Sequence, residues 1–249
     1  EQDLLINDAI FGLFVYNYAN VGGDYNLTRD KLISYIMNNK LSYTEAGKQI
    51  TGWALAGNKI NPDITGAVLS ALAPFNSDKY PQVKDAVSKA VESLALIQDD
   101  GGYMKDSFGT FSESLSFAII GLVSVGVNPE DGKFKKANGD LVSALISFKG
   151  TEGQYKHSMD GANNYMATEQ ALRAFYSLKQ YKETGKYDFY KSEIDANKLP
   201  VYGFVPTTSN EPTLPQTGSL NDLYVHIFLG MILVCAGIYL VTRKKVNNF

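Results

Sequence analysis

Cysteine is almost absent from this chain, since Cys235 is the single one among 249 residues. An intramolecular disulfide is therefore excluded, and so is a zinc site built on two or four thiolates. Histidine is also scarce, because only His157 and His226 are present and His157 alone lies in the body of the chain. No second histidine or thiol stands near it in the sequence to complete a transition-metal site, so we expect no metal centre.

A basic stripe is missing as well. The first 222 residues hold 20 basic and 26 acidic side chains, a net charge of −6, and the remaining residues add only positive charge. Because nucleic-acid binding depends on clustered Lys and Arg that neutralise phosphates, we exclude nucleic acid as a partner. Hydrophobic residues make up 45% of the sequence and charged residues 20%, which is typical of a folded protein and excludes a disordered chain.

The longest apolar run lies near the C-terminus. Residues 223–241 contain 19 residues without a formal charge. A helix of that length spans ~28 Å, close to the ~30 Å hydrocarbon core of a bilayer. Arg243, Lys244 and Lys245 follow the run and should hold its end on the cytoplasmic side. The run therefore predicts one transmembrane helix, and the alternative of a buried core helix is disfavoured because the run has no polar face.

A pentapeptide precedes this helix: Leu214, Pro215, Gln216, Thr217 and Gly218. Pentapeptide, apolar helix and basic tail together resemble the LPxTG sorting signal of Gram-positive surface proteins. The resemblance implies that a sortase cysteine attacks the Thr217 carbonyl, releases the chain from Gly218 onward and passes the acyl group to an amine of the peptidoglycan cross-bridge. The protein would then be secreted and covalently attached to the cell wall, after a transient single-pass membrane intermediate. The alternative is a permanently tethered membrane protein.

Half of the eight prolines fall just before or within this motif, at Pro200, Pro206, Pro212 and Pro215. Such a stretch predicts an extended, semi-rigid spacer. We therefore divide the chain into a folded domain (1–198), a proline-rich linker (199–213), the sorting motif (214–218), and a membrane helix with a basic tail (219–249).

The folded domain reads as all-α. Apolar residues recur at helical spacing in seven windows, and a short eighth window follows. The expected helices cover residues 3–18, 28–38, 62–73, 81–98, 111–125, 139–148, 165–181 and 187–197. Thr28 and Asn61 precede two of them as plausible N-caps, and Pro62 occupies a first helical position. No run of alternating residues predicts a strand.

A period of about 50 residues underlies these helices. Trp53, Tyr103 and Tyr155 stand at corresponding loop positions, each shortly after a glycine. A helix with an acid in its first turn follows each aromatic residue, and these acids are Asp63, Glu113 and Glu169. Helix pairs that repeat in this way predict an inner and an outer row, as in an α/α-toroid or a segment of one.

The loop Gln98-Asp99-Asp100-Gly101-Gly102-Tyr103 resembles the glutamine–Asp-Gly-Gly–aromatic repeat of the squalene cyclase and prenyltransferase superfamily. The segments 69–74 and 166–172 resemble the bacterial surface branch of these repeats, which is similar to the α domain of transcobalamin and intrinsic factor. The resemblance covers residues 3–182 and implies a toroid that binds a ligand, with a corrinoid as one candidate. The helix count is short of a complete ring, so we expect further pairs before Glu1, or an arc closed by the tyrosine-rich segment 181–190.

The enzymes of this superfamily do not fit the sequence. The acid motif of terpene cyclases, the zinc ligands of prenyltransferases and the thioester element of related toroids are all missing. A glycan-active toroid would need two placed carboxylates, for which Asp63, Glu113 and Glu169 are candidates at one mouth of the ring. Acids in a first turn also complement the helix dipole without any catalysis, so we expect the domain not to be an enzyme.

Binding is therefore the leading function. Seven residues are the candidates for contact with a small or apolar ligand: Trp53, Asp63, Tyr103, Glu113, Tyr155, His157 and Glu169. The loop aromatics could equally pack between repeats, and His157 could be an ordinary loop residue. A wall-anchored ligand-capture module is the first hypothesis. An adhesin or structural display domain that contacts a host or polymer ligand is the alternative, and a glycan-active enzyme is the third.

Overall fold

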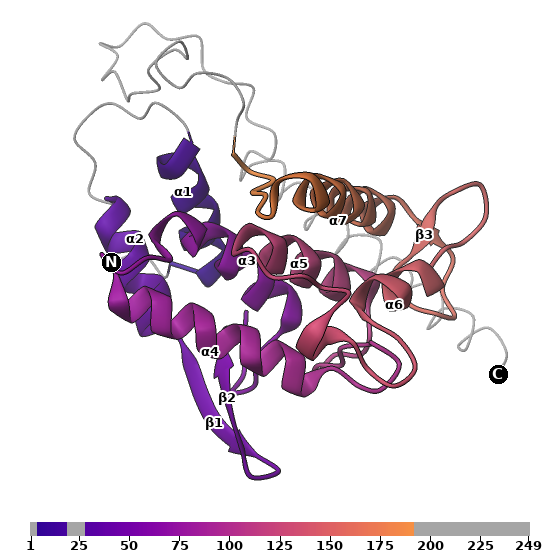
Figure 1. Cartoon of the computed structure of the whole chain (residues 1–249), viewed down its shortest axis with the longest axis horizontal. Coiled ribbons are helices and arrows are strands. Elements are labelled where there is room, and N and C mark those ends of the chain that lie inside the picture. Colours follow the sequence, from indigo (N-terminus) through magenta and orange to yellow (C-terminus); the bar gives the residue numbers. More distant parts are fainter. Residues whose placement is uncertain (1–3, 19–27, 192–249) are drawn as a thin grey trace, which may run out of the picture. The chain divides into compact units, whose positions relative to one another are not determined.

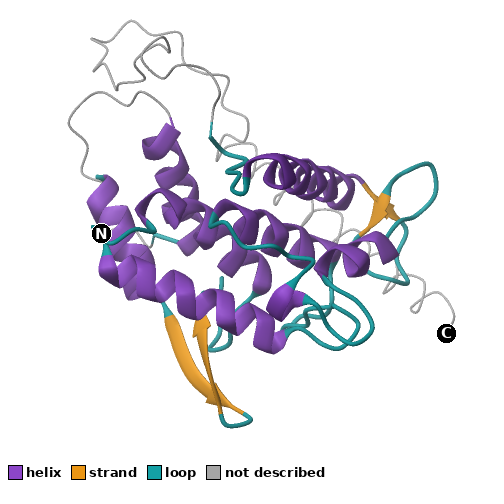
Figure 2. Ribbon diagram, viewed as in Figure 1, coloured by secondary structure: helices purple, strands orange, loops and turns teal. Residues whose placement is uncertain are grey.

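The computed structural model describes residues 4–18 and 28–191 (Figure 1). Helices dominate this part of the chain, together with two short antiparallel sheets (Figure 2). The seven α-helices within it are α1 (Ile6–Tyr18), α2 (Arg29–Asn38), α3 (Pro62–Leu72), α4 (Pro81–Ile97), α5 (Ser112–Ser124), α6 (Leu141–Ser147) and α7 (Tyr165–Thr184). Single 3₁₀ turns cover Ala73–Phe75 and Gly132–Phe134. No helix of the described residues is apolar over enough length to cross a bilayer, and the expected membrane helix lies outside them.

All seven expected helices are confirmed, with ends that differ by a few residues. The largest difference at a C-terminus is in α7, which continues past Tyr181 and stops at Gly185, whose left-handed φ of 75° ends the helix. The short eighth helix is not present over residues 187–191, and the rest of that window lies outside the described residues.

The helix starts agree partly with the expected caps. The Thr28 side chain accepts a hydrogen bond from the Lys31 N–H at 3.3 Å, as expected of an N-cap. Asn61 occupies the cap position of α3 but does not cap the helix. Its Oδ1 instead accepts from the Leu55 N–H and its Nδ2 donates to Asp106, both at 3.0 Å, so this side chain links two loops.

The helices form the two alternating rows that the repeat predicts. The odd-numbered helices pack on one another in the order α1, α3, α5, α7, and α2, α4 and α6 each pack on the odd-numbered helix that precedes them (Figure 1). One cluster of buried apolar side chains includes residues from all seven helices. A closed ring is not shown by these elements, so the toroid itself remains a prediction.

The contact between α3 and α5 is a close approach of two backbones. A β-carbon added at Gly66 of α3 would lie 2.2 Å from the carbonyl oxygen of Phe117, and one added at Gly121 of α5 would lie 2.3 Å from the carbonyl oxygen of Gly66. Only residues without a side chain allow two helices to come this near. The glycines of α3 and α5 therefore set the spacing between these two helices.

A β-hairpin interrupts the helical pattern, contrary to the expectation that no strand would occur. Its strands β1 (Leu41–Glu45) and β2 (Lys48–Gly52) pair antiparallel from Leu41↔Gly52 to Glu45↔Lys48 and are drawn in orange in Figure 2. The strands are short and polar, so local periodicity is weak. Support comes from α4, where the Ser93 hydroxyl accepts a hydrogen bond from the Thr51 N–H at 2.7 Å. A second pair, β3 (Tyr155–Lys156) and β4 (Asn163–Asn164), precedes α7.

The segment after α7, residues 186–191, crosses back over the row of inner helices; we call it the strap. The Tyr187 N–H donates to the Val123 carbonyl at 3.0 Å, at the end of α5. The Tyr190 ring stacks on Phe14 of α1, with centroids 3.9 Å apart. The strap thus connects the end of α7 to α1, the two outermost helices of the row.

Candidate functional site

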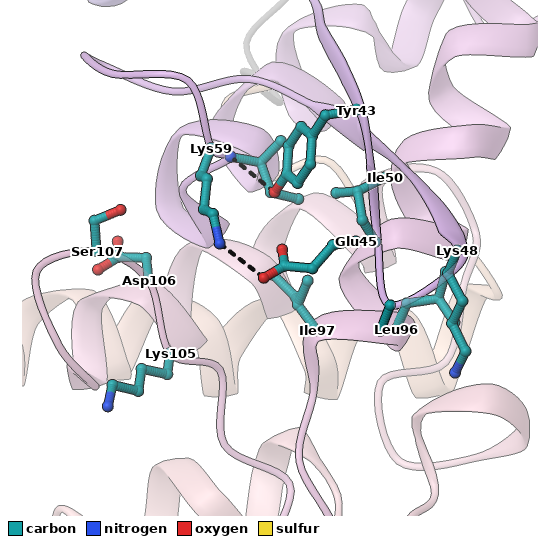
Figure 3. Close-up of a pocket in the computed structure, with 12 residues that line it drawn as sticks. Tyr43, Glu45, Lys48, Ile50, Lys59, Leu96, Ile97, Lys105, Asp106 and Ser107 are labelled. Carbon is teal, nitrogen blue, oxygen red and sulfur yellow. Dashed lines mark hydrogen bonds and ion pairs between the residues drawn. The ribbon is translucent and has the colours of Figure 1, made fainter.

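A groove of about 540 Å³ opens beside the β-hairpin (Figure 3). Four parts of the chain line it: the facing residues of β1 and β2, the loop around Lys59, the last turn of α4, and the loop 105–107. Cross-strand partners in a hairpin share one face, so Tyr43 with Ile50 and Glu45 with Lys48 present their side chains on the same side. That face forms one wall of the groove.

The floor of the groove is apolar. Ile50 and Ile60 are each 3% exposed, whereas Leu96 at the end of α4 is 39% exposed and offers its side chain to a ligand. Tyr43 stands over this floor, and its hydroxyl oxygen accepts a hydrogen bond from the Ile60 N–H at 3.4 Å. Burial raises the pKa of the Tyr43 phenol above its usual value of 10.0, so the hydroxyl stays protonated at neutral pH.

The rim of the groove is charged, with three lysines and two carboxylates, those of Glu45 and Asp106. Lys48, Lys59 and Lys105 come from three separate elements, and Figure 3 shows Lys48 and Lys105 at opposite ends of the group. Lys59 pairs with Glu45 at 2.7 Å, and this hydrogen bond raises the pKa of the Lys59 ammonium. Within the described ranges, the side chains of Lys48 and Lys105 make no hydrogen bond or ion pair. The two carboxylates of the lining have partners, since Glu45 pairs with Lys59 and Asp106 accepts from Asn61, whereas the lysines at the two ends have none among the described residues.

The acids of the expected ring mouth have different environments. Glu113, in the first turn of α5, meets His157 from the loop before α7, with Nδ1 2.9 Å from Oε2 and 3.0 Å from Oε1. The imidazole also stacks on Phe111, with ring centroids 4.3 Å apart. The structure therefore brings together Glu113 and His157, which the repeat had placed at one mouth.

Asp63 and Glu169 do not join that pair. Burial raises the pKa of the Asp63 carboxyl above 3.8, and the negative charges of Asp106 and Glu113 add to this effect. Glu169 is paired with Arg173, one turn later on α7. Among the residues that the structure describes, no group of three or more His, Cys, Asp or Glu side chains is arranged to hold a metal ion.

Each of the three loop aromatics contacts another side chain or backbone group of the domain. Trp53 is fully buried and its indole N–H donates to the Ile36 carbonyl at 2.6 Å, so its ring has no exposed surface for a ligand. Tyr103 is half-buried, and its hydroxyl lies 2.8 Å from the Ser147 hydroxyl. Tyr155 packs against Phe175, with ring centroids 5.7 Å apart.

Two of these aromatics make the same kind of contact with the helix that follows them. The Trp53 N–H donates to the Thr65 hydroxyl at 3.0 Å, and the Tyr155 N–H donates to the Thr168 hydroxyl at 2.8 Å. Each threonine lies in the first turns of the inner helix that follows its aromatic residue. The same backbone-to-hydroxyl contact therefore ties loop to helix in two repeats.

Sequence reasoning missed the groove completely. None of Tyr43, Lys48, Lys59, Leu96 and Lys105 was a candidate, because the hairpin that assembles them was not expected. The available signal was the alternation of residues on either side of Ala46-Gly47, where a two-residue turn separates two runs with aromatic and β-branched side chains.

The sorting motif, the linker and the basic tail lie outside the described residues. A comparison with protein-family models matched residues 206–248 to the LPXTG cell wall anchor motif. Comparisons with curated proteins and with solved structures found no match. The matched segment contains the pentapeptide, the apolar run and the basic residues. The chain is therefore a Gram-positive surface protein that is secreted, processed by sortase and covalently attached to the cell wall.

Proposed function

We propose that the helical domain is a binding module displayed on the cell wall, and that the groove beside the β-hairpin is its contact site. The observation that carries the proposal is the combination of an apolar floor with unpaired lysines in one groove. Binding sites commonly join apolar surface with a few convergent polar groups, and volumes of ~300–1,000 Å³ are usual for them. The wall anchor presents this groove to the outside of the cell.

The same contacts support binding over catalysis. Two of the three carboxylates expected at the ring mouth are used within the domain, since Glu113 holds His157 and Glu169 holds Arg173, while the third, Asp63, is largely buried and its Oδ1 has no partner among the described residues. A glycan-active enzyme instead needs two carboxyl groups that both face a substrate. The alternating rows further support placing the domain among the α/α-toroids, in which a rigid helical frame carries the contact surface.

The open form of the groove favours adhesion to a larger partner as the leading activity. A small ligand is the second candidate, because a volume of about 540 Å³ also suits a small molecule. The corrinoid implied by the transcobalamin resemblance belongs to this second class. Native mass spectrometry of the protein mixed with corrinoids tests it, and a retained corrinoid mass would favour capture over adhesion.

Cells that display the full chain on their wall provide the test of adhesion. Their attachment to a panel of immobilised extracellular proteins and glycans is compared with that of cells displaying Leu96→Asp, which places a charge on the groove floor. Leu172→Asp on α7 is the matched control, because Leu172 is 67% exposed and lies outside the groove lining. Attachment that only Leu96→Asp reduces supports the proposal. Attachment equal in all three strains, or glycan cleavage that Glu113→Gln abolishes, contradicts it.

A further inference from the structure

We propose that the groove binds an extended, acidic peptide segment of a partner protein, with one apolar side chain seated on the floor and carboxylates beside the lysines. This inference rests on the proposed function, because it names the ligand chemistry of the same groove. It commits to a protein partner and not to an anionic polymer of the wall.

The arrangement of charge points to an acidic ligand. Lys48 and Lys105 are exposed at opposite ends of the group that lines the groove (Figure 3), and neither is neutralised by a described residue. A chain lying along the groove would pass both ammonium groups. The groove lining holds three lysines against two carboxylates, and this local excess of positive charge favours an acidic ligand by charge complementarity.

The floor points to a peptide. Leu96 and the partly buried Ile97 end α4 and line the groove together with Ile50 and Ile60, and because both isoleucines are almost fully buried, Leu96 offers most of the exposed apolar surface. A polyphosphate or a glycerol-phosphate polymer has anionic groups but no apolar side chain to cover it. An acidic peptide supplies both, since an aliphatic side chain can stand between carboxylates.

Tyr43 adds a donor that suits a peptide backbone. Its hydroxyl oxygen already accepts from the Ile60 N–H, while its own O–H has no acceptor among the described residues. The phenol can therefore donate to a carbonyl or carboxylate oxygen of the ligand. One donor over the floor and two cations at the ends fix the position of a bound segment.

Fluorescence anisotropy with the purified full-length chain tests the inference. The probe is a labelled peptide with a central leucine flanked by Asp-Glu pairs. Matched probes replace the leucine with serine, or the acids with lysine, and unlabelled lipoteichoic acid serves as a competing polyanion. The protein variants are Lys48→Glu with Lys105→Glu, Leu96→Ser, and the control Lys179→Glu, whose exposed lysine on α7 lies outside the groove lining.

We expect the acidic leucine peptide to bind. The variant with both Lys48→Glu and Lys105→Glu should bind it with an affinity lower by about tenfold or more, because attraction of the peptide's carboxylates becomes repulsion at both ends of the groove. The Leu96→Ser protein should bind the leucine peptide several-fold more weakly, and the wild-type protein should bind the serine peptide more weakly by a similar factor. The Lys179→Glu protein should bind like the wild type. Binding should also weaken with added salt, because exposed charges are screened.

Three results would overturn the inference. If the acidic peptide does not bind, or binds no better than the lysine peptide, the groove does not select an acidic ligand. If the double variant lowers the affinity for the peptide no more than Lys179→Glu does, the two lysines do not bind the carboxylates of the peptide. If lipoteichoic acid depends on Lys48 and Lys105 while the peptide does not, the occupant is a wall polymer. In that last case, the groove remains a binding site and the proposed function stands; it fails separately if Leu96→Asp leaves attachment to every probe of the adhesion panel unchanged.

Discussion

Gly66 and Gly121 face each other where α3 crosses α5, so closely that a β-carbon on Gly121 would lie 2.3 Å from the Gly66 carbonyl oxygen. The obstacle is backbone, which cannot rotate away as a side chain can. The close packing of α3 on α5 therefore requires glycine at both positions, because a hydrogen is the only side chain that fits there.

Gly66→Ala is expected to lower the free energy of unfolding by about 1–3 kcal/mol or more, because it forces atoms into a filled interface. Gly12→Ala in α1 is the matched control. Its β-carbon would meet only the flexible Leu32 side chain at 3.3 Å, and alanine favours a helix over glycine by about 0.5–1 kcal/mol. Chemical denaturation measures both variants. Equal losses at the two positions would show that the α3–α5 crossing is not unusually close.

The hairpin turn offers a stabilising substitution. Ala46 has a φ of 50°, in the left-handed region, and Gly47 follows with a φ of 75°. A residue with a β-carbon costs about 1–2 kcal/mol in this conformation, and asparagine tolerates it better. Ala46→Asn should therefore slow amide exchange in β1 and β2, whereas Gly47→Ala should speed it. Faster exchange in the asparagine variant would contradict the turn geometry.

The strap should contribute to stability through one aromatic stack. Tyr190→Ala removes the ring that lies 3.9 Å from Phe14, and we expect a loss of about 1–3 kcal/mol together with faster proteolysis after α7. Tyr165→Ala is the control, because Tyr165 is 84% exposed at the start of α7. If the two variants unfold alike, the strap does not hold α1 and α7 together.

The carboxyl of Asp63 should make stability depend on pH. Burial raises its pKa in the folded state above 3.8, so the folded protein binds the proton more tightly than the unfolded chain. The contribution of the Asp63 carboxyl to the free energy of unfolding is therefore lost as the pH rises from about 3.8 through the raised pKa. Asp63→Asn should therefore be more stable than wild type at neutral pH, with the difference disappearing below about pH 3.8.

Asp78→Asn is the control of opposite sign. The hydrogen bond from Lys84 lowers the pKa of the Asp78 carboxyl, so its contribution is present above pH 3.8 and is lost as pH falls through the lowered pKa. Denaturation curves at several pH values compare the two variants. A destabilised Asp63→Asn at neutral pH would mean that the charged form is favoured in the fold.

The helices could be predicted from sequence because their signals are local. Pro62 begins α3 and the apolar spacing that follows defines its buried face, while Thr28 marks the start of α2. The repeat placed Glu113 and His157 near one end of the row, but it did not predict their contact. The groove could not be predicted in this way. Its hairpin depends on Ser93, 42 residues away, and its rim on Lys105 from another loop, so only tertiary packing assembles it.

Thr217 should decide how the protein is held at the surface. The resemblance to sorting signals implies that its carbonyl receives the sortase cysteine, so Thr217→Ala should block cleavage and leave the uncleaved chain in the membrane. The variant should then be extracted from cells by detergent, whereas the wild type should require a wall hydrolase. Gln216→Ala is the matched control, because that position is the variable one in LPxTG. A Thr217→Ala protein that still resists detergent and leaves only with the digested wall would show that cleavage takes place elsewhere in the chain.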